Sequence, residues 1–352
     1  MITATPLSVR EGSGTYVTAA LLARALRDLG HEVREVHPLR AAGPLGFTAH
    51  RFGFNWSLSA AAFDDTDVVV GWDMDGYRLA GRLPHPFVTY VHGQLAEEAA
   101  FERGLVAASM RLQARAERHS ARHADRVITV SARSRRRIAE LYGVPLERIA
   151  TVPPPFDVAR WQTALDAVDP LARDGRPTVL SVARMYSRKN LASLVRATAM
   201  LCRQIPDVRV RIVGDGPERG RLTALVRSLG LEASIQLPGQ ISFRALIEAY
   251  GSCDVFCLPS LQEGFGLVFL EAMAAAVPVI ACRGTAADEL IEDGVNGLLV
   301  DQQEDAALAE AIVSLLEDPA RQRSMGAAGL TRVAQYEPVA IAEQFMTAIS
   351  FT

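Results

Sequence analysis

The chain has 352 residues, of which 49% are hydrophobic and 22% charged, and its formal net charge is −3. This length exceeds what one hydrophobic core usually supports and predicts two domains. The small negative charge argues against nucleic acid as a main partner. No apolar run reaches the roughly 18–20 residues of a membrane span, and the N-terminus lacks a signal-peptide pattern, so we expect a cytoplasmic protein. The cysteines lack zinc-site spacing and are expected to be buried small hydrophobes.

The first half of the chain alternates helical and strand patterns. Residues 18–26 have helical apolar spacing that ends at Gly30, a favourable C-terminal stop, and residues 31–36 alternate like a strand. Short apolar runs typical of buried parallel strands follow at 68–70, 87–91 and 127–130. This alternation predicts a doubly wound α/β sheet.

Three consecutive prolines at 153–155 mark the end of that half, and residues 157–176 are expected to form a linker. A second alternation follows, with strands predicted at 178–182, 208–213, 255–258 and 278–281 and helices at 190–204, 218–229 and 267–276. The simplest architecture is two Rossmann-like domains facing each other across a cleft, residues 1–165 and residues 166–336. Residues 337–352 form a C-terminal helix, and its return to the N-terminal domain is one alternative.

The segment from Pro259 to Glu271 combines features of a ligand site. It places Glu263 in a turn between a predicted buried strand and a helix, with Gly264 and Gly266 allowing close approach of the backbone to a ligand. The free amides at a helix N-terminus favour anions. A carboxylate at the same place accepts hydrogen bonds from hydroxyls. A phosphorylated sugar meets both requirements.

Lys189 is the single lysine among 37 basic residues. It shares with Arg184 a loop that follows the predicted strand at 178–182, at the carboxyl end where open α/β sheets bind ligands. A compact ammonium suits a phosphate oxygen in a crowded site. We therefore predict that the pair neutralises a diphosphate, the alternative being a solvated loop with incidental charge.

Three glycine-containing turns are weaker candidates. Gly12 and Gly14 precede the first helix as half of a dinucleotide fingerprint, but no acidic residue closes the second strand to support nicotinamide binding. They could approach a phosphate or sugar, or form a plain turn. Residues 214–217 are explained by turn chemistry alone. Gly239, Gln240 and Ile241 close another strand and could lie beside a nucleotide base.

His92 follows the predicted strand at 87–91 and precedes a glycine, so it is expected to face the cleft. Asp73 and Asp75 have the D-x-D spacing that can hold a divalent metal. They lie in the first half, whereas the phosphate-type features lie in the second. We therefore expect no metal at this pair, and contact with an acceptor stays open.

A basic face is expected on one helix of the first half, where arginines recur at Arg111, Arg115, Arg118 and Arg122. Such a face could contact an anionic membrane surface, at the inner face of the membrane, or an acidic acceptor. A solvated helix face is an equally good interpretation.

Together these residues resemble the retaining glycosyltransferases of family 4, also described as glycosyl transferases group 1, which have the GT-B fold. The resemblance spans about residues 12–299, and Glu263 to Glu271 match the E-x7-E signature. It implies that Glu263 contacts the hydroxyls of the donor sugar and that Glu271 holds the ribose. It also implies that Arg184 and Lys189 bind the diphosphate and that His92 lies near the sugar.

Further correspondences are expected in the loops. The resemblance implies donor contacts from the amides of Phe265, Gly266 and Leu267 and from the glycine loop of Gly12 and Gly14. Asp157 ends a segment similar to the family's interdomain P-x-G-V-D. The segment from Gly284 to Glu289 departs from the family pattern because it lacks the usual glycine pair.

The implied reaction moves a sugar from a nucleotide-diphosphate sugar, of UDP or GDP type, to an acceptor hydroxyl with retained anomeric configuration. The acceptor is a glycan, a lipid-linked compound or a small molecule. In the front-face mechanism the leaving phosphate takes the acceptor proton, and no metal or other cofactor is required. Two alternatives stay open, a nucleotide-sugar isomerase or epimerase on the same fold and a non-catalytic nucleotide-sugar-binding module.

Overall fold

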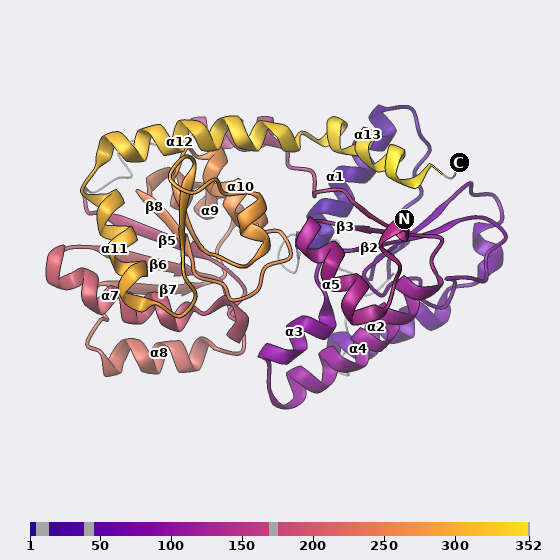
Figure 1. The fold of residues 1–352 in the computed structure, drawn as a ribbon, viewed down its shortest axis with the longest axis horizontal. Helices are drawn as coiled ribbons and strands as arrows, with labels where there is room; N and C mark the ends of the chain where they lie inside the picture. The colour runs from indigo at the N-terminus through magenta and orange to yellow at the C-terminus, as the bar shows by residue number, and fades with distance from the viewer. Residues whose placement is uncertain (5–13, 39–45, 169–174, 351–352) are drawn as a thin grey trace. The chain divides into compact units, whose positions relative to one another are not determined.

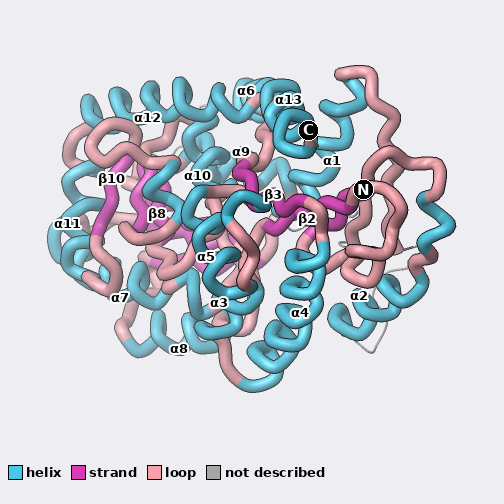
Figure 2. Tube along the Cα trace, turned by 45° about the vertical axis from the view of Figure 1, so that its right-hand side comes forward, coloured by secondary structure: helices cyan, strands magenta, loops and turns pink. Residues whose placement is uncertain are grey.

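The computed structural model describes residues 1–4, 14–38, 46–168 and 175–350. The contacts divide the chain into two compact units. Unit 1 comprises Met1–Phe156 and Tyr336–Thr352, and unit 2 comprises Asp157–Gln335. Each unit is built on a parallel sheet with helices packed around it (Figure 1; Figure 2). The prediction of an α/β chain with two parallel sheets is confirmed.

The sheet of unit 1 has four strands in the order β1-β2-β3-β4. These strands are β1 (Val69–Trp72), β2 (Phe87–Val91), β3 (Arg126–Thr129) and β4 (Ile149–Thr151). The helices of unit 1 are α1 (Gly14–Asp28), α2 (Gly46–Ser57), α3 (Leu95–Phe101), α4 (Gly104–His123), α5 (Ala132–Tyr142) and α13 (Pro338–Ile349). Strands β1 and β2 are buried along their whole length, as expected of apolar strands covered on both faces.

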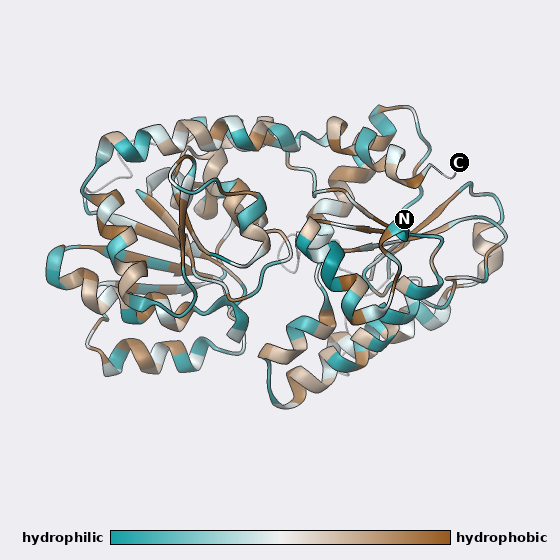
Figure 3. Ribbon diagram, viewed as in Figure 1, coloured by the Kyte–Doolittle hydropathy of each residue, from teal (hydrophilic) through white to brown (hydrophobic). Residues whose placement is uncertain are grey.

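The sheet of unit 2 has six strands in the order β10-β9-β8-β5-β6-β7. They are β5 (Thr178–Val182), β6 (Arg209–Val213), β7 (Ile235–Gly239), β8 (Val255–Leu258), β9 (Val279–Cys282) and β10 (Gly297–Val300). The helices are α6 (Val158–Asp166), α7 (Leu191–Gln204), α8 (Arg219–Ser228), α9 (Phe243–Ser252), α10 (Leu267–Ala274), α11 (Asp305–Leu316) and α12 (Pro319–Val333). Helices α7 and α8 lie on one face of this sheet, and α9, α10 and α12 on the other (Figure 1). The central strands are mainly hydrophobic, whereas the helices carry mixed residues (Figure 3).

The boundary between the units lies after Phe156, not after residue 165 as predicted. The expected linker at 157–176 begins instead with α6, whose N-terminus is capped because the Asp157 carboxylate accepts a hydrogen bond from the Arg160 amide at 3.0 Å. Trp161 on this helix is buried, and its ring centroid lies 5.5 Å from that of Tyr250. This packing joins α6 to unit 2, and it depends on a partner far away in the sequence.

The strand predicted at 31–36 is not formed, and only Val36 makes an isolated bridge, with Ile2. The Ile2 amide donates to the Val70 carbonyl at 2.8 Å, and the Thr3 amide donates to the Val36 carbonyl at 3.1 Å. The N-terminal residues therefore lie between β1 and Val36. The alternation at 31–36 lies in a largely exposed segment whose backbone pairs with the N-terminal residues without forming a strand.

The C-terminal helix α13 belongs to unit 1. Its buried stripe consists of Ile341, Ala342, Phe345 and Ile349, and the Phe345 ring stacks on Tyr90 of β2 at 6.1 Å between centroids. Across the described residues, no helix combines the length and apolar character that a transmembrane span requires.

Asp75 joins three parts of unit 1 through its fully buried carboxylate. It accepts hydrogen bonds from Arg51 Nε at 2.8 Å, from Asn55 Nδ2 at 3.0 Å and from the Ala4 amide at 2.7 Å. Arg51 and Asn55 lie on α2, so this carboxylate ties α2 and the N-terminal residues to the loop after β1. Both oxygens are engaged, which makes Asp75 a structural residue.

Replacing Asp75 by Ala should lower the free energy of unfolding by about 3–5 kcal/mol, because it leaves the Arg51 charge buried without its partner. Chemical denaturation measures the loss. The matched control is Asp65→Ala, because Asp65 pairs with Arg34 at 3.1 Å but has a 75% exposed side chain. The control should cost less than about 1 kcal/mol. Similar losses in the two variants would contradict the structural role of Asp75.

Candidate functional site

Lys189 and Glu263 form an ion pair in unit 2, with Nζ donating to Oε1 at 2.5 Å. The two side chains are largely buried, at 12% and 7% exposed. Ser260 donates its hydroxyl to the same Oε1 at 2.7 Å. The structure thus brings together two residues that the sequence analysis predicted from separate motifs, and it adds Ser260 to them.

The pair controls the charge of the site. Burial alone would raise the pKa of the Glu263 carboxyl, but the charges of Lys189 and Arg188 and the hydrogen bonds from Lys189 and Ser260 lower the pKa below its ordinary value. Glu263 therefore stays ionised at neutral pH and can accept hydrogen bonds from ligand hydroxyls. Neither Arg188 nor Ser260 was a candidate from the sequence, although both are neighbours of predicted motifs.

Both partners lie at the carboxyl edge of the sheet. Lys189 ends a short 3-10 helix, Ser187–Lys189, in the loop after β5, and Glu263 lies in the loop between β8 and α10. The Leu261 amide donates to the Arg188 carbonyl at 2.8 Å and joins these two loops. The ion pair is therefore positioned by backbone contacts as well as by charge.

Gly266 determines where α10 begins. Its φ is +99°, and a Cβ atom at this position would lie 2.5 Å from the Phe269 ring. Only glycine meets both conditions without strain. Leu267 is the first residue of α10, so the free amides of its first turn, which favour anions, lie in the loop that carries Glu263.

Arg184 is exposed, with its guanidinium carbon 5.9 Å from the centre of the Tyr186 ring. Its neighbours are fixed by the turn after β6, because a Cβ at Gly214 would lie 2.0 Å from the Ala183 carbonyl oxygen. A Cβ at Gly216 would lie 2.7 Å from the Met185 carbonyl oxygen. These glycines therefore allow the β6 turn to pack against the Arg184 loop, which agrees with their interpretation as structural.

Glu271 lies on α10, and its Oε2 accepts a hydrogen bond from the Tyr250 hydroxyl at 2.7 Å. Burial raises the pKa of the Glu271 carboxyl to about 7, and the hydrogen bond from Tyr250 opposes this shift only in part. Glu271 is thus poised to change charge near neutral pH. Tyr250 comes from α9, and no local pattern in the sequence indicated it.

The remaining predicted donor contacts of unit 2 fall in two loops. Gly239 ends β7, and its carbonyl accepts a hydrogen bond from the Gly214 amide at 2.9 Å. Gln240 follows as an exposed residue. Ile241, Phe265 and Leu267 are at least partly buried. Gly284 and Thr285 have local roles, because the Gly284 amide donates to Asp288 at 2.8 Å and the Thr285 hydroxyl caps the next turn.

His92 and Gly14 belong to unit 1, whereas Gly12 lies outside the described residues. His92 stacks on Tyr90 at 4.8 Å between ring centroids. Within the described chain, neither of its buried ring nitrogens has a hydrogen-bond partner. Burial lowers the pKa of His92 to about 3, so the imidazole is neutral. A neutral ring with unused nitrogens is suited to contact with a polar ligand.

Asp73 holds the backbone that presents His92. Its Oδ1 accepts a hydrogen bond from the His92 amide at 2.9 Å, and its Oδ2 lies 3.8 Å from Arg51. Burial raises the pKa of Asp73 to about 6, although Arg51 opposes the shift. Because Arg51 engages both oxygens of Asp75, the D-x-D pair is not arranged around a metal. Contact of Asp73 with an acceptor stays a prediction.

The basic face of α4 is present as an exposed stripe that contains Arg111, Arg115, Arg118 and Arg122. The last of these donates its Nε to the Tyr142 carbonyl at 2.6 Å and so also fastens α4 to α5. The opposite face of α4 is buried.

Sequence comparisons match both units to glycosyltransferase models. The sequence model described as "Glycosyl transferases group 1" matches residues 165–332, and the one described as "Glycosyltransferase Family 4" matches residues 12–160. A D-inositol 3-phosphate glycosyltransferase of Kineococcus radiotolerans is 36% identical over 230 residues, 59% of this chain and 53% of that protein. A GDP-mannose-dependent alpha-(1-6)-phosphatidylinositol monomannoside mannosyltransferase of Mycolicibacterium smegmatis is 35% identical over 222 residues, 58% of this chain and 56% of that protein. The chain thus spans a little over half the length of these relatives.

Solved structures share the fold at low sequence identity. Sucrose-phosphate synthase from Thermosynechococcus elongatus has a TM-score of 0.78 at 24% identity, covering 98% of this chain and 96% of that one. Anabaena HepE, in complex with UDP and glucose, has a TM-score of 0.77 at 20% identity. The match covers 99% of this chain and 98% of that one. These matches show the GT-B fold. The two sequence models together cover both units, and the chain belongs to the group 1 glycosyltransferases.

Proposed function

We propose that the chain is a retaining glycosyltransferase that moves a sugar from a nucleotide-diphosphate sugar to an acceptor hydroxyl without a metal ion. The observation that carries this proposal is the ion pair of Lys189 and Glu263 beside the first turn of α10. A cation and free helix amides suit a diphosphate, and an ionised carboxylate suits sugar hydroxyls.

In the proposed reaction the bond between the anomeric carbon and the diphosphate oxygen breaks, and negative charge develops on the leaving group. Lys189, Arg184 and the amides of α10 stabilise that charge. The ammonium has three N–H donors, so it can bind a phosphate oxygen while it keeps Glu263. The acceptor hydroxyl forms the new bond on the same face and gives its proton to the leaving phosphate. Glu263 accepts hydrogen bonds from the sugar hydroxyls and so orients the sugar for this step.

The names of relatives and neighbours support this donor class. One relative is named for GDP-mannose, and one structural neighbour was solved with UDP-glucose. Two relatives are named for inositol compounds, D-inositol 3-phosphate in one and phosphatidylinositol monomannoside in the other. We propose a soluble or lipid-linked polyol as acceptor. For a lipid-linked acceptor, the arginine face of α4 would contact anionic lipid at the inner face of the membrane.

The proposed function is tested by incubating the protein with a panel of UDP- and GDP-sugars, with and without inositol-bearing acceptors. We expect nucleotide release that depends on the acceptor, and a product whose NMR coupling constant shows retained anomeric configuration. Conversion of the nucleotide sugar in the absence of any acceptor would support the isomerase alternative instead. Binding without any turnover would support the non-catalytic alternative.

Lys189→Ala should lower kcat by roughly 10²–10³-fold, by analogy with the loss of one oxyanion donor. Steady-state kinetics with the best donor of the panel measures this. Because the variant also leaves Glu263 without its cation, its melting temperature is recorded, and Lys189→Arg provides a variant that keeps the charge. The matched control is Arg203→Ala, which removes one exposed cation from α7. Near-normal turnover in folded Lys189→Ala would contradict the role of this residue.

Donor affinity should rise with pH because ribose hydroxyls donate to the ionised form of Glu271. With a pKa of about 7, this carboxyl is mostly protonated at pH 6 and mostly ionised at pH 8. We expect Kd for a nucleotide sugar to fall about tenfold between these values. Calorimetric titration measures Kd, and Glu271→Gln should bind weakly with no pH dependence. If Kd of the Glu271→Gln variant changed with pH as it does in the unmodified protein, the titrating group would be another residue.

A further inference from the structure

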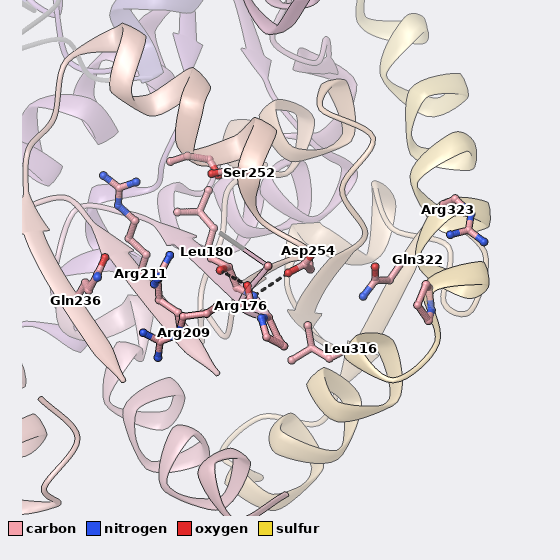
Figure 4. A pocket seen from close by; sticks show the side chains of 15 residues that line it. Arg176, Leu180, Arg209, Arg211, Gln236, Ser252, Asp254, Leu316, Gln322 and Arg323 are labelled. Carbon is pink, nitrogen blue, oxygen red and sulfur yellow. Dashed lines mark hydrogen bonds between the residues drawn. The ribbon is translucent and has the colours of Figure 1, made fainter. Parts of the chain in front are cut away.

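A pocket of unit 2 lies at the amino ends of its strands, away from the Lys189–Glu263 pair. Its volume is about 480 Å³. Its lining includes four arginines, Arg176, Arg209, Arg211 and Arg323. Figure 4 shows Arg209 and Arg211 near Gln236, with Arg323 at the other end on α12. The volume suits a small molecule.

Among the described residues that line the pocket, Asp254 is the single acidic one, and its Oδ2 accepts a hydrogen bond from the Thr178 amide at 2.8 Å. The Nε atom of Arg211 is buried and, among the residues that the structure describes, has no hydrogen-bond partner. The described lining therefore holds four guanidinium groups and one carboxylate, and the Arg211 Nε donor is unused.

The position of these arginines in the sheet is unusual. Residues two apart on a strand share a face, so Arg209 and Arg211 lie on the same face of β6. Strands of parallel sheets are normally apolar on both faces. An anion bound at this face would lie within reach of both guanidinium groups.

This pocket is separate from the donor site. Thr178 begins β5, Arg209 begins β6 and Asp254 precedes β8, whereas the donor loops follow the opposite ends of these strands. A strand of five residues spans about 17 Å. The pocket and the Lys189–Glu263 pair therefore lie at opposite edges of one sheet.

We propose that this pocket binds a small phosphate-bearing ligand, held by the guanidinium groups of Arg209 and Arg211. Planar guanidinium groups bind phosphate oxygens through paired hydrogen bonds. The neutral donor Gln236 lines the same space. The site needs neither the donor nor the acceptor of the proposed reaction.

The test uses inorganic pyrophosphate as the probe and the full chain with Lys189→Ala, which removes diphosphate binding in the donor loop. When the pyrophosphate concentration is ten times its Kd, the melting temperature of this variant should rise by about 3–6 °C at constant ionic strength. Adding Arg211→Met should weaken pyrophosphate affinity at least tenfold. Methionine keeps an unbranched apolar chain over the sheet, so the melting temperature without pyrophosphate should stay equal or increase.

Two comparisons make the result decisive. Arg244→Met removes an arginine of α9 whose side chain is 91% exposed, and it should leave the pyrophosphate response unchanged. Arg323→Met changes an exposed residue of the pocket and should weaken the response two- to threefold even if Arg211→Met fails to fold. The proposal is overturned if Lys189→Ala alone abolishes the response, or if the pocket variants respond like the Arg244 control.

Discussion

The parallel direction of all six strands in unit 2 is the constraint on which its chemistry depends. Because the carboxyl ends of parallel strands meet at one edge, the loops after β5, β6 and β8 are brought together although they lie far apart in the sequence. Lys189 and Glu263 are 74 residues apart, and they form an ion pair at this edge. The amino ends meet at the other edge, where the arginines of the pocket gather.

Burial has opposite consequences for two carboxylates of one short segment. Glu263 has a cation within hydrogen-bond distance, and its pKa falls below the ordinary value. Glu271 accepts a hydrogen bond from the neutral Tyr250 hydroxyl, and burial raises its pKa to about 7. In unit 1, both carboxylate oxygens of Asp75 already accept hydrogen bonds from Arg51. The partner of a buried carboxylate sets the charge of that carboxylate. This partner, and not the occurrence of the residue in a motif, decides whether the carboxylate can bind a ligand.

Features that depend on neighbours in the sequence were predicted well. The strand at 178–182 has the predicted bounds, and the helix predicted at 190–204 begins one residue later. The turn at Gly214 was interpreted as structural, and its close packing against Ala183 agrees with that interpretation, although this contact is not local. The predicted linker and the predicted strand at 31–36 were wrong, because Trp161 packs on a distant aromatic residue and Val36 forms an isolated bridge with Ile2 in place of a strand.

The sequence by itself determined the α/β alternation, the glycine-containing loop from Pro259 to Glu271 and the special position of Lys189. The periodicity of apolar residues, the positions of glycines and the occurrence of a single lysine can all be read along the chain. Only the tertiary structure decided which side chains meet: Tyr250 with Glu271, Ser260 with Glu263, and Arg51 with Asp75. The physical reason is that pairing and burial, which set the charge of each group, arise from contacts that no local pattern encodes.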